Sequence, residues 1–354
     1  MRELLLNSLE IENFRAFRHL QIERLGRVNL IVGKNNIGKT SLLEALYLYA
    51  RQASFVAIWD VLEARGEGTR PPFERASSVE AINDQVTAIA QLFYGRIVLD
   101  HAPAAIRIGN ILNVPATLTL DVSWQHATEA GIGEHAGPRI MNGLLVRRGK
   151  GAQVAYTFDQ TALWLREPPQ GWPCQYVTTT GLPPDQISSL WNATTLTDRE
   201  TDVIVALQLI EPAVERVNLL TERAYPAVVK LTDTAEPVRL RSLGEGMNRL
   251  FTIILALVNA KNGLLLIDEI ENGLHYAIQP RVWQIIFHIA QRLNVQLFAT
   301  THSWDCIEAF QIAADEHPEE GQIIKLGRKG NDIIASHFAE QAMAIITRDH
   351  IEVR

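Results

Sequence analysis

The segment GKNNIGKT, residues 33–40, has the residue types and spacing of a loop that binds phosphate. Gly33 is followed after four residues by Gly38, Lys39 and Thr40. Glycines let backbone N–H groups curl around phosphate oxygens, and a helix starting at the loop adds its N-terminal dipole. We expect Lys39 to neutralise the β- and γ-phosphates of a nucleotide and Thr40 to ligate Mg²⁺. The predicted contacts come from Gly33, Lys34, Asn35, Asn36, Ile37, Gly38, Lys39, Thr40 and Ser41.

Two carboxylates end a second apolar segment, GLLLIDE at residues 263–269. Phosphates bind at the carboxyl edge of a parallel sheet, so we expect Asp268 to hold Mg²⁺ and Glu269 to orient and deprotonate the attacking water. His302 follows a third apolar segment, residues 295–299, where a γ-phosphate sensor would lie. The alternatives are that the carboxylates cap the next helix and that the histidine is structural.

The segment SLGEG, residues 242–246, places two glycines at the head of an apolar, helix-like run. Glycine is unfavourable inside a helix, which indicates that backbone approaches another group closely at this point. The alternative is a turn that merely precedes a core helix.

The elements around these motifs alternate between strand and helix patterns. Strands are expected within residues 3–32, a polar loop over residues 60–78 and a helix over residues 79–95. Residues 97–177 alternate apolar and polar positions with frequent turn signals, which predicts antiparallel hairpins. From residue 196 onward, helical periods alternate with apolar strands, which predicts a parallel sheet covered on both faces, followed by a hairpin and a short final helix.

The composition excludes few function classes. The chain has 354 residues, of which 47% are hydrophobic, and a formal net charge of −7, so no global positive field attracts nucleic acid. Cys174 and Cys306 lie far apart and fit no metal spacing, which favours buried thiols in a reducing compartment. No segment approaches the roughly 20 apolar residues of a membrane span. We therefore expect a soluble, cytoplasmic protein.

Together these motifs resemble the ATP-binding-cassette (ABC) class of AAA-type ATPases, within it the soluble branch with SMC, RecF and OLD-type heads. Residues 9–20, LEIENFRAFRHL, are similar to the strand before the phosphate loop in this branch, which implies that Arg15 lies near the nucleotide phosphates. Residues 242–246 resemble the signature loop, residues 268–275 the Walker B motif and D-loop, and His302 the switch histidine. The resemblance covers nearly the whole chain.

The resemblance implies hydrolysis of ATP with Mg²⁺ by an ATP-sandwiched homodimer or higher homo-oligomer. In this class the signature loop contacts the nucleotide held by the partner's phosphate loop, which implies such contacts from Ser242, Gly244, Glu245 and Gly246. The chain is most similar to stand-alone OLD-like ATPases of bacterial defence systems, which implies a separate, nuclease-like effector. Membrane partners are not expected.

The implied fold is α/β, a P-loop NTPase with a mainly parallel sheet flanked by helices, N-terminal antiparallel strands and a β-rich insertion. We expect residues 1–96 to form the N-terminal part of the ATPase head with Walker A, and residues 97–195 the insertion. Residues 196–354 would form the C-terminal part with the signature, Walker B, D-loop and switch histidine.

The pattern departs from the class at several points. Glu245 replaces the second glycine of the transporter-type signature, as is usual in the soluble branch. Gln85 and Gln91 are candidates for the glutamine that completes Mg²⁺ coordination, and neither is assigned. About fifty residues follow His302, without an Asp-x-Asp pair, so we expect no nuclease chemistry in this chain.

Three alternatives remain open. A RecF-like protein would grip duplex DNA, in repair or replication, when ATP closes the dimer; the acidic net charge counts against it. The nucleotide-binding subunit of a transporter is disfavoured by the β-rich insertion and the N-terminal strand. A P-loop kinase would lack the signature loop and the switch histidine.

Overall fold

The computed structural model describes residues 3–71, 79–96, 104–111, 117–128, 131–133, 139–148, 153–157, 171–220 and 227–337. Within these ranges, none of the helices is both long enough and apolar enough to cross a membrane. The short final helix expected from the sequence lies outside the described residues.

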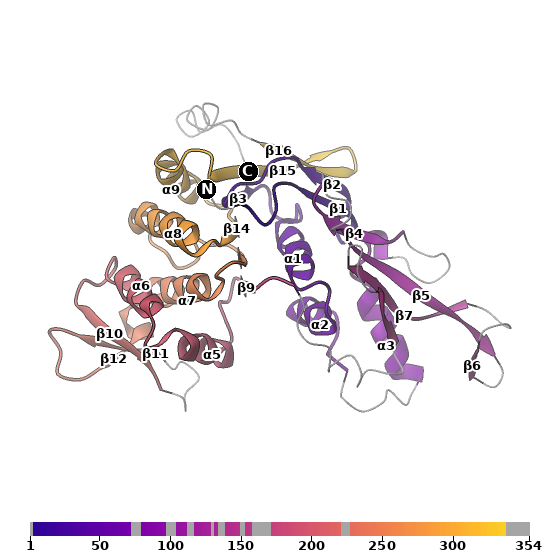
Figure 1. The fold of residues 1–354 in the computed structure, drawn as a ribbon, viewed down its shortest axis with the longest axis horizontal. Coiled ribbons are helices and arrows are strands. Elements are labelled where there is room, and N and C mark those ends of the chain that lie inside the picture. The colour runs from indigo at the N-terminus through magenta and orange to yellow at the C-terminus, as the bar shows by residue number, and fades with distance from the viewer. Residues whose placement is uncertain are drawn as a thin grey trace.

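A six-stranded sheet forms the centre of the fold (Figure 1). In spatial order its strands are β16 (Asp332–His337), β15 (Gly321–Lys329), β3 (Val28–Val32), β14 (Gln296–Thr300), β13 (Leu264–Ile267) and β9 (Cys174–Val177). All neighbours run parallel except β16, which pairs antiparallel with β15. Strands β3, β13 and β14 are buried along their whole length, which explains why their sequences are continuous apolar runs.

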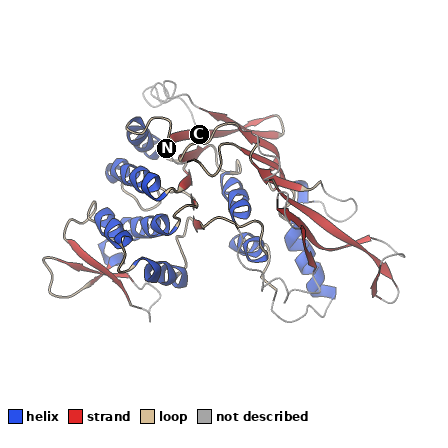
Figure 2. Cartoon of the chain, viewed as in Figure 1, coloured by secondary structure: helices blue, strands red, loops and turns tan. Residues whose placement is uncertain are grey.

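Alternate residues of strand β13 face opposite sides of the sheet and pack against different helices. Leu264 and Leu266 belong to a hydrophobic cluster with α1 (Lys39–Ala50), α2 (Phe55–Ala64) and α3 (Val79–Ala90). Leu265 and Ile267 belong to a second cluster on the other face (Figure 2). The helices of that second cluster are α5 (Pro184–Thr194), α6 (Asp198–Leu207), α7 (Glu245–Asn259), α8 (Gln279–Leu293) and α9 (Trp304–Asp315). The predicted parallel sheet with helices on both faces is confirmed.

The N-terminal hairpin and the insertion form one antiparallel sheet. Its order is β2-β1-β4-β5-β7-β8, with β6 paired to β5. The strands are β1 (Leu9–Phe14), β2 (Phe17–Ile22), β4 (Ile106–Gly109), β5 (Leu118–Thr128), β6 (Gly131–Gly133), β7 (Arg139–Arg148) and β8 (Gln153–Thr157). The predicted N-terminal antiparallel strands and the β-rich insertion are therefore both present, and they share one sheet.

A third sheet was not predicted. It contains β10 (Val214–Leu219), β11 (Ala227–Leu231) and β12 (Val238–Arg239), all antiparallel. Strand β12 leads into a 3₁₀ helix, η3 (Leu240–Leu243), which contacts β11 and β12 and precedes α7. This small sheet thereby fixes the entry to the glycine-rich segment.

Two expectations about segment boundaries differ from the structure. The loop expected over residues 60–78 is helical up to Ala64, where α2 ends. Ser54 caps the start of this helix by accepting a hydrogen bond from the Ala57 N–H at 3.3 Å. Residues 72–78 of that loop lie outside the described residues. Strand β9, inside the segment 97–195, pairs in parallel with β13 in the central sheet. The domain limits themselves remain predictions.

Candidate functional site

The loop between β3 and α1 is curled by residues in left-handed conformations. Asn36 has a φ of 60° and Gly38 a φ of 99°. The Lys39 Nζ donates hydrogen bonds to the carbonyl oxygens of Gly33 at 2.7 Å and Lys34 at 3.2 Å. The ammonium group therefore lies within the loop, where it can neutralise a bound phosphate. Burial lowers the pKa of Lys39, and the neighbouring Asp268 carboxylate opposes this shift.

A cavity of about 510 Å³ opens beside this loop. Both carboxylates predicted for the site face it, together with most of the predicted loop residues. Gly33, Lys34 and Ile37 are the exceptions. The Ile37 side chain is only 5% exposed and packs into the hydrophobic cluster around α1. The cavity is lined by Ala16, Asn35, Asn36, Gly38, Lys39, Thr40, Ser41, Arg65, Asp268 and Glu269.

A carboxylate and a hydroxyl meet at the edge of this cavity. The Thr40 Oγ1 donates to the Asp268 Oδ2 at 2.9 Å, and the Thr300 Oγ1 donates to the Asp268 Oδ1 at 2.5 Å. Hard oxygen donors of this kind suit Mg²⁺, which is held by few protein groups and by substrate phosphates. The arrangement of Thr40 and Asp268 thus fits the predicted metal role.

Glu269 is held in an unusual backbone conformation, with a φ of 47°. Its N–H donates to the Thr300 Oγ1 at 2.9 Å, and its Oε2 accepts a hydrogen bond from the Asn272 Nδ2 at 3.0 Å. Strained conformations of non-glycine residues persist where surrounding contacts determine them. The side chain is 35% exposed, so water can reach the carboxylate that these contacts position.

The structure brings His302 next to Glu269. The His302 Nδ1 lies 3.7 Å from the Glu269 Oε1, and the histidine side chain is 48% exposed. Strands β13 and β14 are parallel neighbours, so the residues that follow their carboxyl ends meet at one edge of the sheet.

The signature-like segment lies outside this cavity. Ser242 and Gly244 are exposed, and Gly244 has a φ of 107°. A Cβ on Gly246 would lie 2.7 Å from the carbonyl oxygen of Gly273, so the start of α7 approaches the turn after β13 too closely for a side chain. Among the residues that the structure describes, no side chain caps the N-terminus of α7. The chain therefore presents a helix N-terminus to solvent beside the turn that follows β13.

Arg15 lies in an ion-pair cluster and is not among the residues that line the cavity. Its Nε lies 2.7 Å from the Glu44 Oε2 and its Nη2 lies 2.9 Å from the Glu67 Oε2, with the side chain 5% exposed. Arg65, which the sequence did not single out, lies 2.6 Å from the other oxygen of Glu44 and donates to the Ser41 Oγ at 3.3 Å. Arg65 is the arginine that borders the cavity.

The two glutamines considered for Mg²⁺ coordination do not line the cavity. Gln85 lies within α3 and is 4% exposed. The Gln91 Nε2 donates to the carbonyl oxygen of Thr87 at 3.5 Å. Neither is brought to Asp268.

A buried arginine holds the backbone of the two carboxylate residues. Arg249 of α7 is 7% exposed, and its Nη atoms donate to the carbonyl oxygens of Thr178 at 2.7 Å, Asp268 at 2.7 Å and Glu269 at 3.0 Å. Burial lowers the pKa of Arg249. A lone arginine in the apolar run MNRLFTIILAL was the signal that could have identified it.

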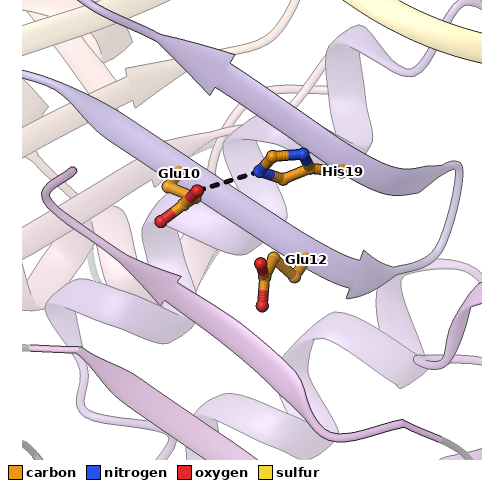
Figure 3. Close-up of side chains that lie close together, drawn as sticks. All are labelled: Glu10, Glu12 and His19. Carbon is orange, nitrogen blue, oxygen red and sulfur yellow. Dashed lines mark hydrogen bonds and ion pairs between the residues drawn. The ribbon is translucent and has the colours of Figure 1, made fainter. Parts of the chain in front are cut away.

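Another group of potential metal ligands lies on the antiparallel sheet (Figure 3). Ligand atoms of Glu10, Glu12 and His19 all lie within 4.8 Å of one another. The His19 Nε2 is 2.8 Å from the Glu10 Oε1, which also accepts from Gln21 at 2.7 Å, and Arg107 lies 3.4 Å from Glu12. The hydrogen bond from His19 lowers the pKa of Glu10. Cross-strand pairing explains this exposed group.

Two family models match separate parts of the chain. Residues 5–91 match an AAA ATPase domain, and residues 200–305 match an AAA domain described as putative AbiEii toxin, type IV TA system. These two segments contain the phosphate loop and the carboxylate pair, respectively.

Several known proteins are similar to the chain. An ATP/GTP phosphatase of Helicobacter pylori is 24% identical over 86% of this chain and 87% of its own length. The DNA replication and repair protein RecF of Thermomicrobium roseum is 43% identical, over 21% of this chain and 20% of RecF. An SMC head bound to the C-terminal winged-helix domain of ScpA aligns with a TM-score of 0.51 and 13% identity, over 96% of this chain and 99% of that one. The chain therefore has the P-loop ATPase fold of an SMC head, and two of its segments match AAA ATPase domains.

The buried arginine of this ATPase generates a stability prediction. Arg249→Leu removes one donor from each of three carbonyl oxygens, of which those of Thr178 and Glu269 keep the backbone N–H groups of Gly181 and Asn272. The free energy of unfolding should therefore fall by about 1–3 kcal/mol. Urea unfolding measures the change. The matched control is Arg216→Leu, because the Arg216 side chain is 80% exposed. A loss for Arg249→Leu no larger than that of the control would show that the three contacts contribute nothing.

The arginine at the cavity of this ATPase generates a binding prediction. Arg65→Ala should weaken MgATP binding about tenfold, because the guanidinium borders the phosphate loop and a charge-assisted hydrogen bond contributes about 1.5–3 kcal/mol. Isothermal titration calorimetry measures the affinity. Arg70→Ala is the control, since Arg70 lies in the same segment but pairs with Asp60 and Glu63. Equal affinities for both variants would remove Arg65 from the site.

Proposed function

We propose that the chain hydrolyses ATP within a homodimer, in which each signature segment closes over the nucleotide held by the other chain. The observation that carries this proposal is the position of Ser242 and Gly244, exposed and outside the cavity that Lys39 lines. An uncapped helix N-terminus binds anions through its backbone N–H groups. The N-terminus of α7 does not face the cavity of its own chain. Its expected ligand is therefore the γ-phosphate of a nucleotide bound by a second chain.

The residues at the cavity divide the chemistry of hydrolysis. Lys39 and the loop N–H groups hold the β- and γ-phosphates, and Thr40 with Asp268 would hold Mg²⁺. When bound, Mg²⁺ neutralises charge that develops on the phosphate oxygens. Glu269 orients the attacking water and accepts its proton, and His302 contacts the γ-phosphate. Asn272 donates to the Glu269 carboxylate, and Thr300 accepts a hydrogen bond from the Glu269 backbone N–H.

The proposed output is control of a separate, nuclease-like effector in bacterial defence. Two observations support it. The family model for residues 200–305 is described as a putative toxin of a toxin–antitoxin system. The SMC head that shares the fold carries a bound partner domain. Affinity purification of an ATP-trapped variant from its native host tests this output, and a stoichiometric nuclease is the expected companion.

A RecF-like role in DNA binding is the second candidate. The 79-residue match to RecF favours it, and the net charge of −7 opposes it. ATP-dependent retention of duplex DNA that weakens steeply with salt would identify this role.

The lysine of the phosphate loop gives the first test. Lys39→Ala should abolish measurable ATP binding and hydrolysis, because no other ammonium group lines the cavity in the described part of the chain. Nucleotide binding is measured by calorimetry and hydrolysis by phosphate release. Lys261→Ala, at an exposed lysine after α7, is the control. Tight ATP binding by Lys39→Ala would contradict the assignment.

The catalytic carboxylate gives the second test. Glu269→Gln should bind ATP, hydrolyse it at least about 100-fold more slowly and accumulate as a dimer, because the proton acceptor is lost while the phosphate contacts remain. Light scattering with ATP and Mg²⁺ at micromolar protein measures the dimer. The control is Glu215→Gln, at an exposed glutamate. A monomeric Glu269→Gln variant, with a monomeric wild type, would disprove the sandwiched dimer.

A further inference from the structure

We infer that Glu271 is a positioning residue that fixes the ring of His302, an inference that rests on the proposed ATP hydrolysis. Glu271 lies two residues after the catalytic carboxylate, in the turn that follows β13. Its Oε1 accepts a hydrogen bond from the backbone N–H of His302 at 3.0 Å and lies 3.2 Å from the His302 Nδ1. One carboxylate oxygen therefore holds both the main chain and the ring of the histidine.

This contact determines which ring nitrogen carries hydrogen. An ionised carboxylate only accepts hydrogen bonds, so the nitrogen that faces Glu271 must be a donor. The nearest oxygen of Glu269 also lies on that side, 3.7 Å from the same Nδ1. The neutral ring is thus held with hydrogen on Nδ1, and Nε2 is the nitrogen left for a ligand. In a neutral imidazole, the hydrogen-bond partner of one ring nitrogen determines whether the other nitrogen carries hydrogen.

The burial of Glu271 supports a positioning role. Its side chain is 9% exposed, whereas that of His302 is 48% exposed. The Glu271 Oε2 is buried and accepts no hydrogen bond from the described residues. A buried carboxylate oxygen without a donor is costly, and such groups in native structures call for a functional explanation. The cost is accounted for if the other oxygen orients a catalytic group.

The same turn touches the other parts of the site. Asn272, next in sequence, donates to the Glu269 carboxylate, and the Gly273 carbonyl oxygen lies against Gly246 at the start of α7. The three residues Glu271–Gly273 therefore contact both catalytic side chains and the signature segment. Glu271 is the member of this turn that acts on His302.

The tautomer of His302 tests the contact without any hydrolysis. The nucleotide-free protein is labelled with ¹⁵N-histidine, and the His302 signals are identified by their loss in His302→Gln. At a pH where the ring is neutral, we expect hydrogen on Nδ1 in the wild type and a shift toward the Nε2–H form in Glu271→Ala. Glu308→Ala, at an exposed glutamate on α9, is the matched control and should match the wild type.

Two further variants distinguish loss of the Glu271 contact from loss of folding. Glu271→Gln keeps an acceptor oxygen and should retain hydrogen on Nδ1, whereas Glu271→Asp keeps the charge, shortens the reach and should lose it. If Glu271→Ala does not fold, the wild type and these two variants decide the question. A wild-type ring with hydrogen on Nε2, or a tautomer unaffected by Glu271→Ala or Glu271→Asp, would overturn the inference.

Kinetics then connect the contact to catalysis. Glu271→Ala should lower kcat about 10- to 100-fold and change KM less than about threefold, because a misplaced catalytic group affects the chemical step more than binding. Glu271→Gln should recover part of kcat. An unchanged kcat in Glu271→Ala would overturn the catalytic part of the inference. A wild type without ATPase activity would refute the proposed function instead, while the tautomer measurement would still decide the contact.

Discussion

The site depends on the two hydrogen bonds that the Asp268 carboxylate accepts. Thr40 belongs to α1 and Thr300 to β14, so the two oxygens of one side chain join the phosphate loop to two neighbouring strands. Thr300 also accepts the N–H of Glu269, which fixes the backbone that turns the second carboxylate toward the cavity. Any shift of β14 relative to β13 would therefore move the proposed metal ligands and the proposed catalytic base together.

Close backbone contact imposes the second constraint. The start of α7 and the turn after β13 approach until only glycine fits at position 246, and Arg249 one turn later ties the same helix to the carbonyl oxygens of Asp268 and Glu269. The signature helix and the catalytic strand end thus behave as one packed unit. Such packing transmits displacement because protein interiors are dense and do not compress.

The parts of the site that sequence could predict are those determined locally or by topology. Spacing places Lys39 and Thr40 at the start of a helix, and adjacent parallel strands bring Asp268 and His302 to one edge. Arg65 could not be predicted, because its position depends on where α2 ends and on contacts with Glu44 and Ser41, more than 20 residues earlier. Motif position alone put Arg15 near the phosphates. In the fold, Arg15 pairs with Glu44 and Glu67 and does not line the cavity, so its approach to the phosphates stays a prediction.

The same packing explains how one chain holds the proposed catalytic groups while its signature-like segment lies outside the cavity. The turn 271–273 lies between the cavity and the signature segment. Glu271 and Asn272 contact His302 and Glu269, whereas Gly273 packs against Gly246. A phosphate bound at the exposed α7 N-terminus would therefore act on a helix that is fastened to this turn by backbone contact and by Arg249. In the proposed dimer, when the signature segment of one chain binds the nucleotide held by the second chain, the catalytic residues of the first chain would shift with it. Packing alone would then couple the two sites, with no residue reaching across both.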